Sequence, residues 1–351
     1  MTTAAILRHL AFAALLALFS AGIVRAMIAV RVMDTPEARK AHDRSTPKGG
    51  GVGIVLAFLV GIAILYRFAE FARLADPYFR GVIGASVAIA VVAFLDDLYD
   101  WPFTVKLGTQ ILAAAVAVGS GLYVQDYSLP YIGLVPIGWL GVPITAVWLL
   151  FATNAMNFID GLNGLSSGVS LIACLFLAGI AAVHGSWFAY AACGLLAAGI
   201  AGFLPFNFPT ARIFMGDVGS QFCGFMLAIL AVVAGRIEGV PLSFMLVPML
   251  LSGVLFDVAF TLVRRAWDRE DVTKPHRGHL YQIAHRSGMS PTVVALVHWG
   301  FAVFGGLCCL LFIDQPRTVK PLVALLPLLP QLAWTCYVVR RSRAVALGRW
   351  G

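Results

Sequence analysis

Acidic side chains gather at a few points of an otherwise apolar sequence. One group of three, Asp96, Asp97 and Asp100, directly follows a run of apolar residues. If a helix continues through these residues, Asp96 and Asp100 share one face and Asp97 lies to one side. Clustered carboxylates repel each other unless a cation neutralises them, and magnesium takes oxygen ligands of this kind. The group therefore predicts a cation or metal site. A water-facing helix end is the alternative, weakened because acids at a helix C-terminus oppose the helix dipole.

A second polar group combines two amides with one carboxylate at helical spacing, at Asn154, Asn157 and Asp160. Residues three apart lie on one face of a helix, so Asn157 and Asp160 can converge on one ligand. The turn that follows, residues 161–164, contains glycines that permit tight backbone geometry and close approach of a substrate. An Asn/Gly turn without a ligand is the alternative interpretation.

Two further groups stand later in the chain. Asp217 comes directly before an apolar run, where the free amides of a helix N-terminus can receive an anion or its metal. Helix capping by Asp217 is the alternative. His276, Arg277 and His279 follow Lys274, and this combination of cations and imidazoles suits phosphate binding. A histidine-rich surface loop is the alternative there, and metal binding by these histidines is less favoured because no softer ligand lies nearby.

The composition places these groups in a membrane protein. Hydrophobic residues make up 60% of the chain and charged residues 12%, against about 25% charged residues in soluble domains. The apolar blocks match the roughly 20 residues that a helix needs to cross a bilayer. A β-barrel is excluded because runs such as 111–118 do not alternate between apolar and polar residues. The cysteines lie within apolar blocks and have no Cys-x-x-Cys pair, so we predict that they are packing residues.

We predict an all-α, polytopic bundle of about eleven transmembrane helices, with ten as the alternative count, forming a single domain over residues 1–351. The predicted spans are 4–30, 49–67, 78–95, 105–123, 137–153, 164–183, 187–205, 218–235, 241–263, 291–313 and 319–339. Basic residues concentrate in the connections on one side, so the positive-inside rule predicts a periplasmic N-terminus and a cytoplasmic C-terminus. All four polar groups then fall on the cytoplasmic side. Together they favour phosphoryl transfer to or from a lipid phosphate.

These motifs, in this order, resemble those of the polyprenyl-phosphate N-acetylhexosamine-1-phosphate transferases, a family that includes the phospho-MurNAc-pentapeptide translocase. The matching residues are Asp34-Thr35-Pro36, Arg39-Lys40-x-His42, Pro47-x-Gly49-Gly50, Asp96-Asp97-x-x-Asp100, Asn154-x-x-Asn157-x-x-Asp160-Gly161-x-Asn163-Gly164-Leu165, Gly216-Asp217-x-Gly219-Ser220, Asp257 before Arg264-Arg265, and His279.

The resemblance implies a magnesium-dependent enzyme of the bacterial inner membrane, with manganese as a possible substitute and an active site facing the cytoplasm. A UDP-linked, N-acetylated hexosamine would give its sugar 1-phosphate to undecaprenyl phosphate, and UMP would leave. The implied partners are these two substrates and membrane lipid, with a second copy of the chain as a further candidate. Nucleic acid is not an expected partner.

The resemblance also implies roles for individual residues. Asp217 and Asp97 would bind the metal, and Asp96 or Asp97 would deprotonate the lipid phosphate or help to hold it. Asp160, with Asn157, would position the nucleotide diphosphate, and His279 would steady the phosphates. The implied catalytic residues are thus Asp96, Asp97, Asp160 and His279, and the substrate-binding residues are Lys48, Lys106, Asn154, Asn157, Asn163, Arg212, His276 and Arg277.

The last loop departs from the common pattern of the family. Relatives that start the enterobacterial common antigen tend to have two further histidines where this chain has Tyr281 and Gln282. That version resembles the branch that initiates O-antigen synthesis from 6-deoxy sugars, and it makes the peptidoglycan precursor a poorer donor. A transporter is the rival of another class, disfavoured because the acids lie at helix ends rather than at mid-bilayer. A CDP-alcohol phosphotransferase is disfavoured because Asp160-Gly161 is not followed by its paired-aspartate motif.

Overall fold

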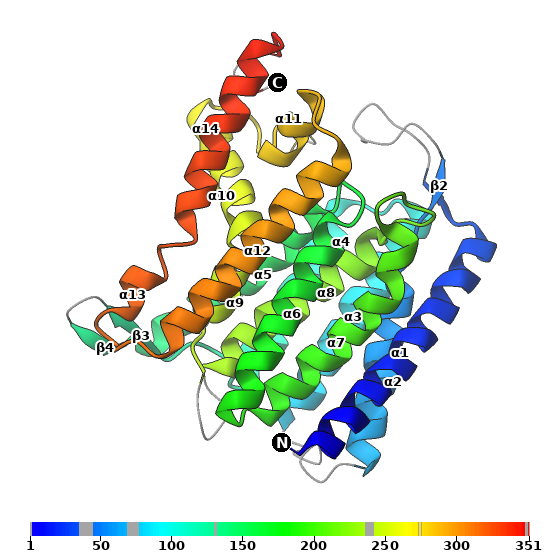
Figure 1. The fold of residues 1–351 in the computed structure, drawn as a ribbon, viewed down its shortest axis with the longest axis vertical. Helices are drawn as coiled ribbons and strands as arrows, with labels where there is room; N and C mark the ends of the chain where they lie inside the picture. Colours follow the sequence, from blue (N-terminus) through cyan, green and yellow to red (C-terminus); the bar gives the residue numbers. More distant parts are fainter. Residues whose placement is uncertain are drawn as a thin grey trace.

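The computed structural model describes residues 2–34, 45–68, 77–129, 132–235, 242–272, 274, 276–347 and 350. Within them the chain forms a helix bundle whose termini lie at opposite ends (Figure 1). The helices are α1 (Thr3–Val30), α2 (Gly51–Phe68), α3 (Pro77–Tyr99), α4 (Phe103–Gly119), α5 (Gly141–Ile159), α6 (Leu165–His184), α7 (Trp187–Asn207), α8 (Gly216–Ala234), α9 (Leu246–Leu250), α10 (Ser252–Trp267), α11 (Leu280–Arg286), α12 (Pro291–Ile313), α13 (Lys320–Val323) and α14 (Leu328–Ala344). The strands are β1 (Met33–Asp34), β2 (Thr46–Pro47), β3 (Asp126–Leu129) and β4 (Gly133–Pro136).

Most of these helices match the predicted membrane spans. In the part of the chain that the structure describes, nine helical segments are long and apolar enough to cross a membrane, and the apolar helix α4 is shorter. The strands form only two small antiparallel pairs, β1 with β2 and β3 with β4. The predicted all-α, polytopic bundle is therefore confirmed.

The predicted span 241–263 is not one continuous helix. α9 ends at Leu250 and α10 begins at Ser252, while residue 241 lies outside the described residues. Pro248 has no amide hydrogen to donate, and Ser252 and Gly253 follow it closely; proline and Gly/Ser pairs are where helices bend. The predicted eleven spans thus correspond to nine long helical segments, the shorter α4 and this broken segment. The last of the nine, Lys320–Ala344, is itself interrupted by turns at residues 324–327 between α13 and α14.

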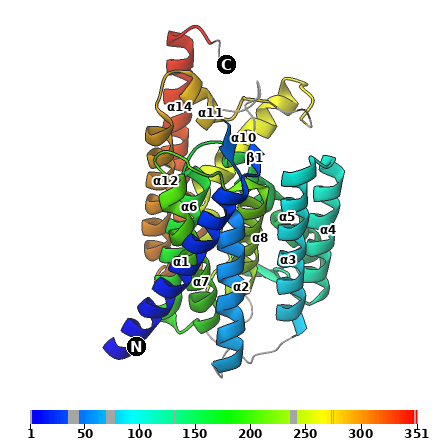
Figure 2. The ribbon, with the colours of Figure 1, turned by 90° about the vertical axis from the view of Figure 1, so that its right-hand side faces the viewer.

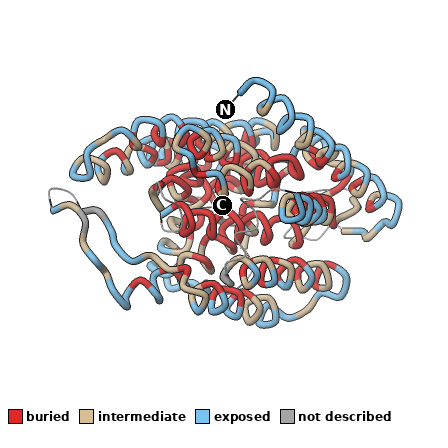
Figure 3. Tube along the Cα trace, turned by 90° about the horizontal axis from the view of Figure 1, so that it is seen from below, coloured by how far each residue is buried: buried red, intermediate tan, exposed pale blue. Residues whose placement is uncertain are grey.

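α8 is the central helix of the bundle. Of its membrane-spanning window, 94% is buried inside the protein, and it packs against α2, α3, α5, α6, α7 and α9. Small residues allow this enclosure: a Cβ atom on Gly51 of α2 would overlap the backbone of Gly219. Seen along the bundle, buried residues fill the middle and exposed residues the rim (Figure 3). The first turn of this enclosed helix carries Asp217.

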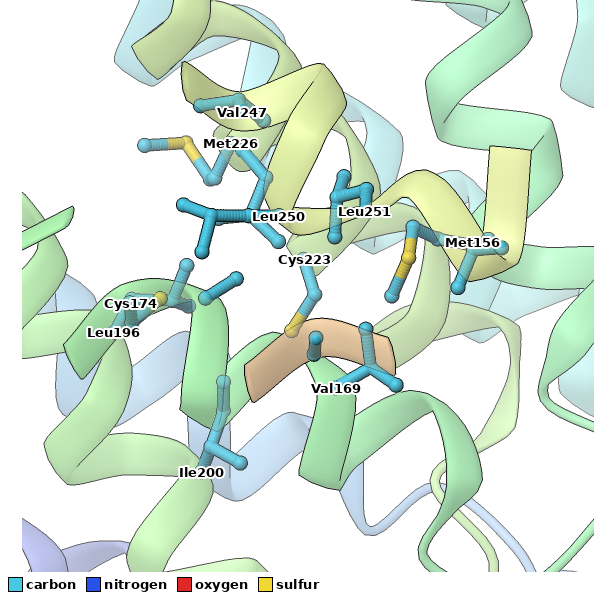
Figure 4. Close-up of a cluster of buried hydrophobic side chains, with 14 of the residues drawn as sticks. Met156, Val169, Cys174, Leu196, Ile200, Cys223, Met226, Val247, Leu250 and Leu251 are labelled. Atoms are coloured by element: carbon cyan, nitrogen blue, oxygen red, sulfur yellow. The ribbon is translucent and has the colours of Figure 1, made fainter. Parts of the chain in front are cut away.

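An apolar layer lies beside the polar residues of α5. Figure 4 shows side chains from α5, α6, α7, α8 and α9 meeting there, including Met156, Val169, Ile200, Cys223 and Leu250. Met156 directly precedes Asn157 on α5, so the same helix turn contributes one side chain to the apolar layer and one to the polar residues beside it. All six cysteines are free, and all but Cys336 are buried, in agreement with their predicted packing role.

A short segment between β2 and α2 runs beside the loop that leads into α8. The Phe214 amide donates to the Pro47 carbonyl at 2.8 Å, and the Gly50 amide donates to the Phe214 carbonyl at 2.9 Å. The β1–β2 pair, with Met33 opposite Pro47, holds the other side of this segment. These contacts fix Lys48 next to the N-terminus of α8.

Candidate active site

Three charged residues from three helices meet at one end of the bundle. Asp96 lies in the last turn of α3, Lys106 in the first turn of α4 and Asp217 in the first turn of α8. The Lys106 ammonium group donates to Asp96 Oδ2 at 2.7 Å and to Asp217 Oδ2 at 2.9 Å. The tight α3–α4 connection, with Pro102 at the N-cap of α4, brings Lys106 back beside Asp96. α3, α4 and α5 stand together along one side of the bundle (Figure 2).

Asp97 is the second buried carboxylate of the same helix turn. Lys48 Nζ lies 3.5 Å from Asp97 Oδ1, and the Val218 amide lies 3.5 Å from Asp97 Oδ2. Asp97 therefore rests against the N-terminal turn of α8, where amides without helical partners favour an anion. Asp100, by contrast, is exposed and has a φ of 50° just beyond the end of α3. The structure brings Asp96 and Asp97 into the cluster and leaves Asp100 outside it.

A network of side-chain amides contacts the Asp217 carboxylate of this cluster. Gln221 Nε2 donates to Asp217 Oδ2 at 3.2 Å, and Gln110 Nε2 donates to Gln221 Oε1 at 2.9 Å. Asn154 Nδ2 then donates to Gln110 Oε1 at 2.6 Å. The Asn154 side chain is thus engaged with the protein rather than directed at a substrate. Sequence reasoning missed Gln110 and Gln221, although each is a polar residue four positions after a charged residue in an apolar helix.

The end of α5 meets the start of α8. Asn157 Nδ2 donates to Ser220 Oγ at 3.0 Å, and the Ser220 hydroxyl donates to the Gly216 carbonyl at 3.2 Å. Asp160 follows at the C-cap of α5. Burial, together with the negative charges of Asp217 and Asp97, holds the pKa of Asp160 well above its ordinary value. The structure therefore places Asn157 and Asp160 beside the carboxylate cluster, as one extended polar site.

The histidine loop is anchored by a buried carboxylate on α10. Asp257 is 1% exposed and accepts from the amides of Leu280 and Tyr281 at 2.9 and 3.0 Å. His279 Nδ1 lies 3.2 Å from Asp257 Oδ1, so this nitrogen carries a proton and Nε2 remains for another partner. The His279 ring lies 6.1 Å from the Phe158 ring, which brings the loop to the end of α5.

His276 is the second imidazole of this loop. Its Nδ1 accepts from the Gly278 amide at 3.1 Å. Burial, His279 and the two arginines Arg265 and Arg264 lower the pKa of His276 to about 4. His276 is therefore neutral at neutral pH and offers one N–H donor, from Nε2, rather than a positive charge. The predicted phosphate-binding role of this loop depends on His279 and Arg277, and Arg277 is half-buried.

The remaining predicted residues lie at the edge of the site or outside the described chain. Asn163 Nδ2 donates to the Pro209 carbonyl at 3.3 Å, and Arg212 is exposed. Within the described residues neither side chain contacts the carboxylate cluster. The motif residues that the structure does not describe are Thr35, Pro36, Arg39, Lys40 and His42.

The fold and the site together define a multi-pass membrane protein with a site of carboxylates, lysines and a histidine at one end of its helix bundle. The sequence model of glycosyl transferase family 4 matches residues 79–235, which span α3 to α8. A protein of Bacillus subtilis (strain 168), a probable undecaprenyl-phosphate N-acetylglucosaminyl 1-phosphate transferase, is 32% identical over 80% of this chain and 78% of its own length.

Two further relatives agree on the family. The decaprenyl-phosphate N-acetylglucosaminephosphotransferase of Mycobacterium tuberculosis is 30% identical over 87% of this chain and 82% of its own length. The phospho-N-acetylmuramoyl-pentapeptide-transferase of Acetivibrio thermocellus is 29% identical over 78% of this chain and 83% of its own length. The chain therefore belongs to glycosyl transferase family 4, among the polyprenyl-phosphate N-acetylhexosamine 1-phosphate transferases, and it is a phosphosugar transferase.

Proposed function

We propose that the protein transfers the 1-phosphate of an N-acetylated hexosamine from a UDP-sugar to undecaprenyl phosphate, which releases UMP and forms an undecaprenyl diphosphate-linked sugar. The observation that carries the proposal is the convergence of Asp96, Lys106 and Asp217 from three helices at one end of the bundle. The polyprenyl phosphate acceptor is supported by the two relatives whose names include undecaprenyl phosphate and decaprenyl phosphate.

The main obstacle to this reaction is the repulsion between two anionic substrates. The lipid phosphate is already an oxyanion near neutral pH, so deprotonation is only part of the problem. Lys106 and Lys48 supply positive charge within a site that also holds Asp96, Asp97 and Asp217. A bound phosphate would compete with these carboxylates for the two ammonium groups, which would align the attacking oxygen and offset the repulsion.

His279 would act on the phosphate groups from the histidine loop. Its Nδ1 is held by Asp257, so the ring orientation is fixed before a substrate binds and Nε2 is the atom free to contact a phosphate oxygen. Neutral His276, 4.8 Å away between ring centroids, would add one hydrogen-bond donor. We assign orientation and charge stabilisation, rather than nucleophilic attack, to these two residues.

A magnesium ion, or manganese in its place, fits the oxygen donors of this site. Magnesium is typically held by one or two carboxylates together with substrate phosphates and water, and Asp217 and Asp97 meet at the start of α8. Among the described residues no group of three or more His, Cys, Asp or Glu side chains could hold a metal by itself. Diphosphate oxygens would therefore complete the coordination. A bound ion would supply charge stabilisation for the phosphoryl oxygens.

We further propose that the enzyme lies in the bacterial inner membrane with its site facing the cytoplasm, and that its product starts O-antigen or a related surface polysaccharide. The orientation is supported by the concentration of basic residues at that end of the bundle. The O-antigen role is supported by the last loop, which resembles that branch at Tyr281 and Gln282.

The test is UMP release by the protein purified in detergent, with undecaprenyl phosphate, magnesium and a panel of UDP-N-acetylhexosamines. The panel includes 6-deoxy sugars and the peptidoglycan precursor. Release that requires both lipid and magnesium, from one donor, would establish the reaction and identify the sugar. Release from the peptidoglycan precursor alone would overturn the O-antigen role. A folded protein that neither releases UMP nor binds a nucleotide or magnesium would overturn the transferase proposal.

A further inference from the structure

Tyr281 occupies a position in the histidine loop that directly links two parts of the site. It is 1% exposed and belongs to α11, and its amide donates to Asp257 Oδ2 at 3.0 Å. Its ring stacks against the His279 ring, with centroids 5.9 Å apart and an interplanar angle of 25°. Backbone and ring therefore tie Tyr281 both to Asp257, the carboxylate that holds His279, and to His279 itself.

The Tyr281 hydroxyl reaches across to a different helix. It donates to the Phe158 carbonyl at 2.9 Å, and Phe158 lies in the last turn of α5, where carbonyls have no intrahelical partner. Gly161 lies against the same hydroxyl, since a Cβ atom on this residue would overlap it. Burial, with Asp257 and Asp160 nearby, raises the pKa of Tyr281 further above its ordinary value. The hydroxyl therefore stays a protonated donor at any working pH.

The neighbouring Gln282 is also engaged within the loop. Its side-chain oxygen accepts from the His279 amide at 3.3 Å, which satisfies the first turn of α11. The Tyr281 hydroxyl and the Gln282 side-chain oxygen are therefore both engaged within the protein.

We infer that Tyr281 is a positioning residue that holds His279 at a fixed separation from the Asn157–Asp160 turn. The inference rests on the proposed function, because it assigns Tyr281 to the same phosphate site. In this chain His279 would contact the phosphates, and Tyr281 and Gln282 maintain the geometry that lets it do so.

The first test is Tyr281→Phe, which removes only the hydroxyl. We expect kcat to fall about tenfold with little change in the KM for the UDP-sugar, as for a lost buried hydrogen bond that matters in the transition state. Tyr66→Phe, at an exposed position on α2, is the matched control and should leave both constants unchanged. Wild-type kinetics for Tyr281→Phe would overturn the inference.

A double-mutant cycle separates positioning from a general structural role. If Tyr281 acts through His279, Tyr281→Phe should cause little further loss in a His279→Ala background. Fully additive losses would contradict the inference. Tyr281→His should be at least as impaired as Tyr281→Phe, because the shorter imidazole does not reach the Phe158 carbonyl; normal activity of that variant would also count against it.

Hydrogen exchange provides a readout that needs no turnover. Tyr281→Phe should raise amide exchange both in residues 157–165 and in α11, because the bond connects these segments. Unchanged exchange in both would overturn the inference. If the wild-type protein releases no UMP but Tyr281→Phe still raises exchange in both segments, the proposed reaction is overturned and the structural link stands.

Discussion

At the scale of single residues, Lys106 is the most informative side chain of the site. Its ammonium group contacts carboxylates from two different helices, Asp96 and Asp217. A lysine placed in this way holds together groups that would otherwise repel each other. Any cation or phosphate that enters the site must therefore change the partners of Lys106. The consequences of removing each carboxylate follow from this arrangement.

Asp217→Asn should reduce turnover by roughly 10²-fold or more, as found when a group that stabilises transition-state charge is removed. The substitution keeps the shape of the side chain, so the protein should remain folded by size-exclusion chromatography and thermal unfolding. The matched control is Asp100→Asn, at an exposed position of the same acidic region, which should retain activity. Ordinary UMP release by Asp217→Asn would remove this residue from the proposed metal site.

Asp96→Asn and Asp97→Asn should have unequal effects when each is measured alone. Asp96 has Lys106 as its ion-pair partner, whereas Asp97 has Lys48 and the Val218 amide. Replacing the carboxylate that contacts the lipid phosphate should cause the larger loss of kcat, roughly 10²-fold. Replacing the carboxylate that binds metal should raise the magnesium concentration needed for half-maximal activity. Near-normal rates for both variants would show that this pair is not part of the chemistry.

The raised pKa of Asp160 predicts that the stability of the fold depends on pH. Its pKa is raised in the folded protein by burial and by Asp217 and Asp97, so the folded state binds this proton more tightly than the unfolded state does. Its contribution to stability is therefore fully present below the ordinary carboxyl pKa of about 4 and is lost as pH rises through the raised value.

Asp160→Asn should remove this contribution and flatten the decline in melting temperature with rising pH. The measurement is thermal unfolding in detergent at a series of pH values from about 4 upward, without substrate or divalent metal. Asp100→Asn should leave the wild-type pH dependence in place. Parallel curves for wild type and Asp160→Asn would show that Asp160 titrates normally.

At the scale of elements, the site depends on how closely α2 approaches α8. Gly51 begins α2 against the backbone of Gly219, and the preceding residues hold Lys48 near Asp97. Helices in a membrane approach this closely only where small residues face each other. A larger residue at this contact would separate the two helices and move Lys48 with α2.

Gly51→Ala should therefore destabilise the protein by about 1–3 kcal/mol, the usual cost of overpacking, and also lower activity. Gly84→Ala on α3, where an added Cβ meets nothing within 4 Å, should be neutral or slightly stabilising because alanine favours the helix. Thermal unfolding and UMP release measured on both variants distinguish these effects. Equal behaviour of the two variants would contradict the close contact.

Hydropathy was sufficient to predict most elements, because twenty apolar residues have few alternatives to a membrane helix. It did not predict the break at Leu251, since α9 and α10 are both apolar enough to be taken as one span. The clustering of Asp96, Asp97, Asp160 and Asp217 was expected from their shared side of the membrane. The roles of Gln110, Gln221 and Asp257 required three-dimensional contacts, because each is a single polar residue that a sequence alone does not pair with a partner.

At the scale of the whole molecule, the chemistry and the centre of the fold share one helix. α8 begins with Asp217 in the site and continues through the interior with 94% of its membrane window buried. It contacts helices on several sides, including α2, α3 and α5, which carry or adjoin other site residues. The site is thus not a loop mounted on the surface of an independent scaffold.

Because α8 is enclosed in this way, ligand binding at the site should raise the melting temperature of the entire protein. A ligand that binds only the folded state stabilises it by an amount that grows with the logarithm of its concentration relative to Kd, about 2.7 kcal/mol at a hundredfold excess. Because α8 has almost no lipid-facing surface, it cannot loosen without the helices around it. A melting scan of detergent-solubilised protein against nucleotides, metals and polyprenyl phosphates would therefore rank ligands before any of them has been shown to react.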